Sequence, residues 1–118
     1  MPRLLLAEDD HTMVSLLKTL LGMEGFQVET LLDKSGEMLE NIRRQMPDIL
    51  LLDVHLGNLN GIELVQQIRQ TPEIQHLKII MFSGIDMEDQ CLTAGADDFL
   101  MKPYMPDDLI QKLRALTG

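Results

Sequence analysis

The chain is poor in several residue types, and each shortage excludes a class of protein. Its one cysteine, Cys91, cannot form an internal disulfide, which is typical of a protein in a reducing cytoplasm. Tryptophan is absent, and with three Phe and one Tyr the core must be aliphatic, so the sequence gives no sign of an aromatic platform for a cofactor. No apolar run approaches a membrane span or a secretory leader, so we expect a cytoplasmic protein without membrane association.

Positive charge is also scarce. Ten Lys and Arg stand against 19 Asp and Glu, which gives a formal net charge of −9 at pH 7. Attraction to nucleic acid phosphates needs the opposite sign, so we expect no direct nucleic acid binding by this chain. What the chain does have is 118 residues, 45% of them hydrophobic and 25% charged, which fits a single compact domain over residues 1–118.

Five apolar blocks typical of strands alternate with five segments of helical periodicity. Unalternating Leu and Ile in the first and third blocks predict strands buried on both faces, whereas alternation in the second block predicts an edge strand. Such repeats form right-handed crossovers, so we expect an α/β fold: a flavodoxin-like, doubly wound (βα)5 parallel five-stranded sheet in the order 2-1-3-4-5. The strands are expected at 3–7, 26–31, 48–53, 77–82 and 99–101, and the helices at 11–24, 39–46, 64–68, 86–94 and 109–116.

Three acidic residues stand at the ends of two of these strands. Glu8 and Asp9 follow the first strand, Asp53 ends the third, and the strand order reverses between them, where open parallel sheets bind ligands. Two carboxylates about 5 Å apart repel by roughly 3 kcal/mol at an effective dielectric of about 20, so this cluster needs a cation or a shifted pKa. Oxygen ligands favour a hard cation, and we expect Mg²⁺. Asp10 is expected to cap the first helix instead.

Four features, in order and each at an expected strand end, resemble those of the receiver domain of two-component response regulators. They are an acidic pair, a single aspartate, a hydroxyl residue and a lysine followed by a proline that is cis in the family. The resemblance covers essentially the whole chain and includes the single-domain chemotaxis-type receivers. The matching residues are Glu8–Asp9, Asp53, Ser83 and Lys102–Pro103.

The resemblance implies that Asp53 accepts a phosphoryl group from a sensor histidine kinase or a histidine phosphotransfer protein. A carboxylate can attack a phosphoryl group to form an acyl phosphate, and catalysis is then mostly positioning and charge neutralisation. By the same resemblance, Mg²⁺ would be bound by Asp9, Asp53, the backbone carbonyl of His55 and, through water, Glu8.

Further roles follow from the same resemblance. Lys102 and Ser83 would bind phosphoryl oxygens, Ser83 and Phe99 would form the switch, and Pro103 would be the cis-proline. The switch would change a face made by the fourth helix, fifth strand and fifth helix, which signals to a downstream output domain or effector protein. Such a protein is a signalling phospho-acceptor rather than an enzyme, although it catalyses its own phosphorylation and its slow dephosphorylation.

One departure from the family affects the expected output. Between Ser83 and Gly95 the chain is about one helical turn shorter than is usual in the family, so the fourth helix, residues 86–94, is expected to be shortened. Asp97, Asp98 and Lys112 resemble charged positions that some DNA-binding regulators use to pair receivers, but their partners on the fourth helix are not evident. We therefore expect the isolated domain to be monomeric.

Three alternatives share parts of this pattern. A flavodoxin-like nucleotide or flavin carrier needs a phosphate loop after the first strand, where the acidic residues would repel a phosphate. A Mg²⁺-dependent phosphatase of the haloacid dehalogenase type needs a second aspartate at the position of His55, and no cap domain fits in the chain. A degenerate receiver that acts only as a protein-docking module is the remaining alternative, which labelling with acetyl phosphate would test.

Overall fold

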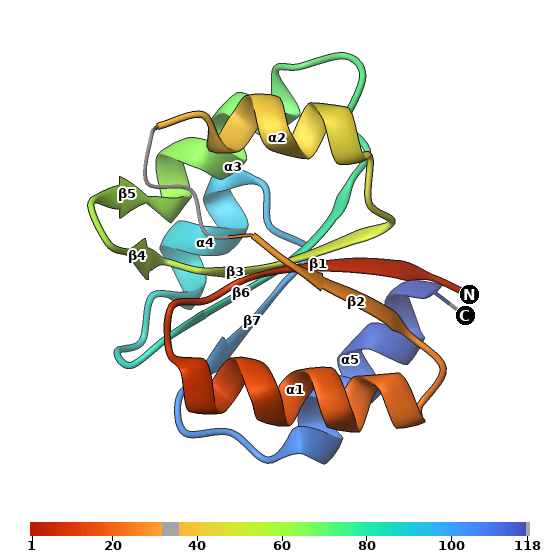
Figure 1. Cartoon of the computed structure of the whole chain (residues 1–118). Coiled ribbons are helices and arrows are strands. Elements are labelled where there is room, and N and C mark those ends of the chain that lie inside the picture. The colour runs from red at the N-terminus through yellow and green to blue at the C-terminus, as the bar shows by residue number, and fades with distance from the viewer. Residues whose placement is uncertain (32–35, 118) are drawn as a thin grey trace.

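A computed structural model of the chain describes residues 1–31 and 36–117 (Figure 1). Its main sheet has five parallel strands in the order β2-β1-β3-β6-β7, which confirms the predicted order. The strands are β1 (Arg3–Ala7), β2 (Gln27–Thr30), β3 (Ile49–Asp53), β6 (Lys78–Ser83) and β7 (Asp98–Met101).

Five helices cover the two faces of the sheet, as a doubly wound fold requires (Figure 1). α1 (His11–Met23) and α5 (Pro106–Thr117) pack on one face. α2 (Met38–Gln45), α3 (Gly61–Arg69) and α4 (Glu88–Ala94) pack on the other. Alternate residues of each strand therefore enter two separate hydrophobic clusters.

The burial of the strands explains their sequence patterns. Every residue of β3 is buried, because helices cover it on both faces and neighbouring strands lie on both sides. β2 is only partly buried and lies at the sheet edge, as its alternating sequence predicts. Among the described residues, no helix has the length and the apolar character needed to cross a membrane.

The connection after β3 differs from the prediction. The sequence indicates only a turn before the third helix, but His55–Leu56 (β4) and Leu59–Asn60 (β5) form a two-residue antiparallel pair. Gly57 turns the chain between them with a φ of 60°, a conformation that glycine adopts without steric cost. The side chain of Asn60 then caps α3 by accepting the backbone N–H groups of Ile62 and Glu63.

The ends of most other elements also differ from the prediction by a few residues, among them those of α2, α4 and β7. The second helix ends at Gln45 rather than at Met46, which has a left-handed backbone with a φ of 45° because Pro47 disfavours the right-handed helical region at the residue before it. The fourth helix begins at Glu88 rather than at residue 86, because Asp86 accepts the Glu88 N–H in a turn. This helix has seven residues, so it is shortened as expected and is shorter than the predicted range 86–94. The last strand begins at Asp98 rather than at residue 99.

Candidate functional site

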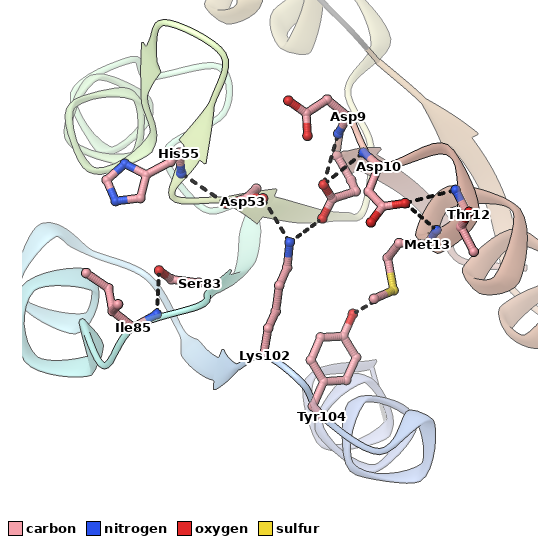
Figure 2. A network of polar contacts seen from close by, with 11 residues as sticks. Asp9, Asp10, Thr12, Met13, Asp53, His55, Ser83, Ile85, Lys102 and Tyr104 are labelled. Atoms are coloured by element: carbon pink, nitrogen blue, oxygen red, sulfur yellow. Dashed lines mark hydrogen bonds and ion pairs between the residues drawn. The ribbon is translucent and has the colours of Figure 1, made fainter.

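The carboxyl ends of the central strands bring the predicted site residues together (Figure 2). β1 leads into the acidic pair Glu8–Asp9, β3 ends at Asp53, β6 ends at Ser83 and Lys102 follows β7. Asp53 pairs in register with Phe82, directly before Ser83, and Ser83 pairs with Met101, directly before Lys102. The parallel register therefore places these residues next to one another along one edge of the sheet.

Lys102 joins the two buried carboxylates of the site. Its Nζ lies 2.7 Å from Glu8 Oε2 and 3.0 Å from Asp53 Oδ2. Burial alone would lower the pKa of Lys102, but the hydrogen bonds and charges of Glu8 and Asp53 outweigh that effect and raise the pKa above its ordinary value. Lys102 is therefore held as a cation between two anions.

Glu8 is held by three donors. Its side chain is 1% exposed, its Oε1 accepts the backbone N–H groups of Asp9 (3.0 Å) and Asp10 (3.1 Å), and its Oε2 accepts Lys102. Asp10 in turn caps α1 through the N–H groups of Thr12 and Met13, as predicted. The turn after β1 is thus organised around a buried carboxylate.

Asp53 is buried but keeps two hydrogen bonds. Oδ1 accepts the backbone N–H of His55 at 3.0 Å, and Oδ2 accepts Lys102. The His55 imidazole is exposed and points away from the Asp53 carboxylate in Figure 2.

Gly61 is a site residue that sequence reasoning missed. A Cβ at this position would lie 2.9 Å from the Val54 carbonyl oxygen and 3.0 Å from that of Asp53, so the start of α3 can approach the end of β3 only with glycine here. The Asn60–Gly61 pair was a signal, although it indicated a turn and not a close approach to Asp53.

The acidic residues could hold a metal ion. Glu8, Asp9 and Asp53 each offer a carboxylate oxygen, and these atoms all lie within 4.8 Å of one another. An all-oxygen donor set suits a hard divalent cation such as Mg²⁺. Lys102 is the cation already beside these carboxylates, so the cluster keeps an excess of negative charge that fits a bound cation.

Ser83 and Phe99, the two predicted switch residues, are both buried and lie on the neighbouring strands β6 and β7. Ser83 is 2% exposed and its Oγ accepts the Ile85 N–H at 3.3 Å. Phe99 is 5% exposed and belongs to the hydrophobic cluster that also contains Cys91 of α4. The peptide bond between Lys102 and Pro103 is cis.

Two aromatic residues that sequence reasoning did not assign to the site form an apolar wall around the lysine. Lys102 Nζ lies 5.0 Å from the centroid of the Phe82 ring, and the Phe82 and Tyr104 rings lie 6.2 Å apart. Burial raises the pKa of Tyr104 to about 12, and its hydroxyl lies 3.9 Å from the sulfur of Met13 (Figure 2). The position of Tyr104 two residues after Lys102 was the available signal. The Lys102 ammonium lies over the face of the Phe82 ring, where a cation is attracted to the aromatic ring.

Comparison with known proteins places the chain in a family. A family model described as the response regulator receiver domain matches residues 4–114. The chain is 34% identical over 119 residues to the phosphate regulon transcriptional regulatory protein PhoB of Rhizobium meliloti (strain 1021), which covers 98% of this chain and 52% of that protein. The chain therefore belongs to the response regulator receiver family, and it spans about half the length of the curated relatives it matches.

Solved structures agree with this assignment. A putative response regulator from Chloroflexus aurantiacus J-10-fl superposes with a TM-score of 0.88 at 30% identity, covering 98% of this chain and 96% of that one. The receiver domain of the sensor histidine kinase PA1611 from Pseudomonas aeruginosa PAO1, which has a magnesium ion coordinated in its active site cleft, superposes with a TM-score of 0.85 at 26% identity. That match covers 99% of this chain and 98% of that one.

Proposed function

We propose that this chain is a phospho-accepting receiver that takes a phosphoryl group from a histidine kinase or a histidine phosphotransfer protein onto Asp53. The observation that carries the proposal is the buried Asp53 carboxylate, held 3.0 Å from Lys102 and clustered with Glu8 and Asp9 in a chain of the receiver family. The alternative of a docking module without phosphorylation gains no support from a site in which all of these residues are present.

In the proposed reaction a carboxylate oxygen of Asp53 attacks the phosphorus atom. A bond forms between that oxygen and phosphorus, and the bond from phosphorus to the donor's imidazole nitrogen breaks, with its electron pair going to the nitrogen. Lys102 already contacts Asp53 Oδ2, so a small movement of its amine brings it to a phosphoryl oxygen. Burial of the site in a low dielectric strengthens that interaction.

The acidic pair supports a role for Mg²⁺ in this reaction. Asp9 and Asp53 would bind the ion directly, together with the backbone carbonyl of His55. Glu8 would act through water, because its two oxygens are already engaged by two N–H groups and Lys102. When bound, the ion would neutralise charge on the transferred phosphoryl group. The solved receiver domain of PA1611, with its magnesium ion in the active site cleft, supports this assignment.

Ser83 is the proposed switch. Its hydroxyl lies beside the site and at present accepts only the N–H of Ile85 among the described residues. A phosphoryl oxygen on Asp53 would give the Ser83 hydroxyl an acceptor and draw its loop inward. The Phe99 side chain is already buried, so it would need to move little further inward when Asp53 is phosphorylated. Output would then pass to another domain or to a separate effector protein, through the face made by α4, β7 and α5.

The experiment that tests this function is phosphoryl labelling. With acetyl phosphate or beryllofluoride and Mg²⁺, the wild type should acquire one adduct by native mass spectrometry, because both oxygens of Glu8 are already engaged by hydrogen bonds and Asp53 is the proposed nucleophile. Asp53→Asn should acquire none, whereas Glu63→Gln, which removes an exposed acid on α3, should label as the wild type does. An adduct on Asp53→Asn would disprove the assignment, and an unlabelled wild type would favour the docking module.

A further inference from the structure

A groove of about 630 Å³ runs along the open edge of the sheet, beside β7. Its lining includes all four residues of β7, and its walls come from the start of α4 and from α5. In the described part of the chain, β7 pairs with β6 on one side and with no strand on the other. Since α4 and α5 pack on opposite faces of the sheet, the edge of β7 lies open between them (Figure 1).

The floor of this groove offers main-chain groups together with one large apolar side chain of β7, that of Met101, which is 51% exposed. Phe99 and Leu100 are 5% and 8% exposed, because they point into the clusters under α4 and α5 respectively. An edge strand presents a row of backbone N–H and C=O groups that another strand can pair with. The groove is therefore better suited to an extended segment, bound by main-chain hydrogen bonds, than to an amphipathic helix, which needs an apolar floor.

The charges around the groove define the chemistry of that segment. Four carboxylates line it, from Asp86, Glu88, Asp98 and Asp108, and they stand against a single amine, that of Lys112. Lys112 is already engaged, since its Nζ lies 2.9 and 3.0 Å from the two carboxylate oxygens of Asp98. The other three carboxylates leave both walls negatively charged, which favours a partner with basic side chains.

We propose that the edge of β7 is a docking site for an extended, positively charged segment of a partner protein. The segment adds to the sheet as a further strand, and its alternate side chains face α4 on one side and α5 on the other. Basic residues then lie beside Asp86 and Glu88 at one wall and beside Asp108 at the other. A second copy of this chain that pairs through the same face is disfavoured as the occupant, because it would bring the same acidic side chains against these. This docking site rests on the proposed function in that it lies on the output face made by α4, β7 and α5, and it names the partner chemistry of that face. The docking itself does not require phosphorylation of Asp53.

Peptide titration tests the proposal on the intact, unphosphorylated chain. The probe is a capped peptide of about eight residues that repeats Lys-Lys-Val-Val, which places lysines on both faces of an added strand of typical length. A second peptide has the same sequence with alternate backbone nitrogens methylated, which removes main-chain donors and keeps the charge. Binding is followed by NMR, and we expect shifts in the backbone amides of Asp98–Met101 with the first peptide and binding at least about tenfold weaker with the second.

Two charge-matched variants separate the groove from the general negative charge of the chain. Glu88→Gln with Asp108→Asn removes two groove carboxylates, and we expect binding to weaken by about fivefold. Glu37→Gln with Glu63→Gln removes one exposed acid directly before α2 and one on α3, and should change the affinity by less than about twofold. Thermal unfolding of both variants would verify that they are folded.

Three results would overturn the proposal. Equal affinity for the methylated and unmethylated peptides would mean that charge alone attracts the probe. Equal weakening in both double variants would mean that the net charge of the chain, and not the groove, attracts it. Shifts that map outside β7, α4 and α5 would place the site elsewhere. None of these results concerns Asp53, so a chain that fails to label at Asp53 yet binds the peptide at β7 would reject the proposed function and support the docking site.

Discussion

Lys102 shows how much a single residue contributes to the candidate site. Its amine bridges the carboxylates of Glu8 and Asp53, which are 1% and 11% exposed. A buried carboxylate is tolerated only when it is paired and hydrogen-bonded, so these acids depend on the lysine while no other cation is bound.

Replacing Lys102 by methionine should therefore destabilise the metal-free protein by about 3 kcal/mol, because it leaves two buried carboxylates without their cation. Lys112→Met is the matched control, since its pair with Asp98 is about one-third exposed on both sides and should contribute less than about 1 kcal/mol. Urea unfolding measures both values. Equal losses in the two variants would contradict this account of the site.

The effect of Lys102→Met should also depend on pH. Because the folded pKa of Lys102 is raised above its ordinary value of 10.5, its ion pairs stabilise the fold fully below that pH and lose their effect as the pH rises through the folded pKa. The difference in stability between wild type and Lys102→Met should be constant from about pH 7 to 10 and shrink above that. A difference that widens in alkali would contradict the raised pKa.

Asp9 is the exposed member of the acidic cluster, and its charge should be costly without metal. We expect Asp9→Asn to stabilise the metal-free protein by about 0.5–1 kcal/mol, since it relieves repulsion from Glu8 and Asp53. Mg²⁺ should raise the melting temperature of the wild type more than that of Asp9→Asn.

Differential scanning calorimetry with and without Mg²⁺ measures both effects. Glu63→Gln, an equal change of charge on the exposed surface of α3, should leave the response to Mg²⁺ unchanged. A metal-free Asp9→Asn protein that melts below the wild type would count against repulsion in the cluster.

At the scale of the element, the end of α2 carries a local conformational cost. Met46 adopts the left-handed region, which costs a non-glycine residue roughly 1 kcal/mol, and its side chain is 58% exposed, so little burial compensates. Arg3 meets this helix end, because its guanidinium donates to the Gln45 carbonyl at 2.7 Å. Arg3 of β1 therefore binds the C-terminus of α2, although the left-handed backbone of the cap residue Met46 is energetically unfavourable.

Met46→Gly should stabilise the protein by about 0.5–1 kcal/mol, because glycine adopts this backbone without strain. The same substitution at Met23, an exposed residue with helical backbone at the end of α1, should give no gain and a small loss. Urea unfolding measures both free energies. A loss at Met46 as large as that at Met23 would show that the left-handed backbone is not costly here.

At the scale of the whole molecule, the face made by α4, β7 and α5 is unsuited to pairing with itself. Asp97 is occupied internally, since its Oδ2 accepts Arg69 at 3.1 Å and the Ile79 N–H at 2.8 Å. Asp98 is bound by Lys112. The seven residues of α4 give a wall only about 10 Å long. Two copies would therefore present a short wall and the same excess of carboxylates to each other.

We accordingly expect the isolated domain to stay monomeric at micromolar concentration after activation with beryllofluoride and Mg²⁺. Specific interfaces bury about 1,200 Å² or more in total, and like charges across such an area oppose association. Multi-angle light scattering with and without beryllofluoride measures the mass. An activated dimer that dissociates in Asp98→Asn would show that this face pairs after all. Asp97 is unsuitable for that control because its replacement would break the bonds to Arg69 and Ile79.

The sequence by itself determined the sheet and the gathering of the acidic residues. Short unbroken apolar runs such as Ile49–Leu52, each ended by polar residues, predict strands buried on both faces, and parallel strands end at the same edge of a sheet. Residues that follow or end such strands, as Asp9 and Asp53 do, must then lie close together. These conclusions need only the spacing of apolar residues along each segment and the handedness of the crossover connections between strands.

Only the tertiary structure decided how these residues are held. Lys102 bonds to Glu8, which is 94 positions away in the sequence, and to Asp53, which is 49 positions away. The close approach of Gly61 to β3 and the groove beside β7 likewise depend on how distant segments pack. The left-handed backbone of Met46 was not predicted for another reason. The helical spacing of apolar residues includes Met46, and Pro47 was therefore expected to end the helix one residue later than it does. A periodic pattern records which face of an element is buried, whereas the partners of a side chain are set when the elements pack together.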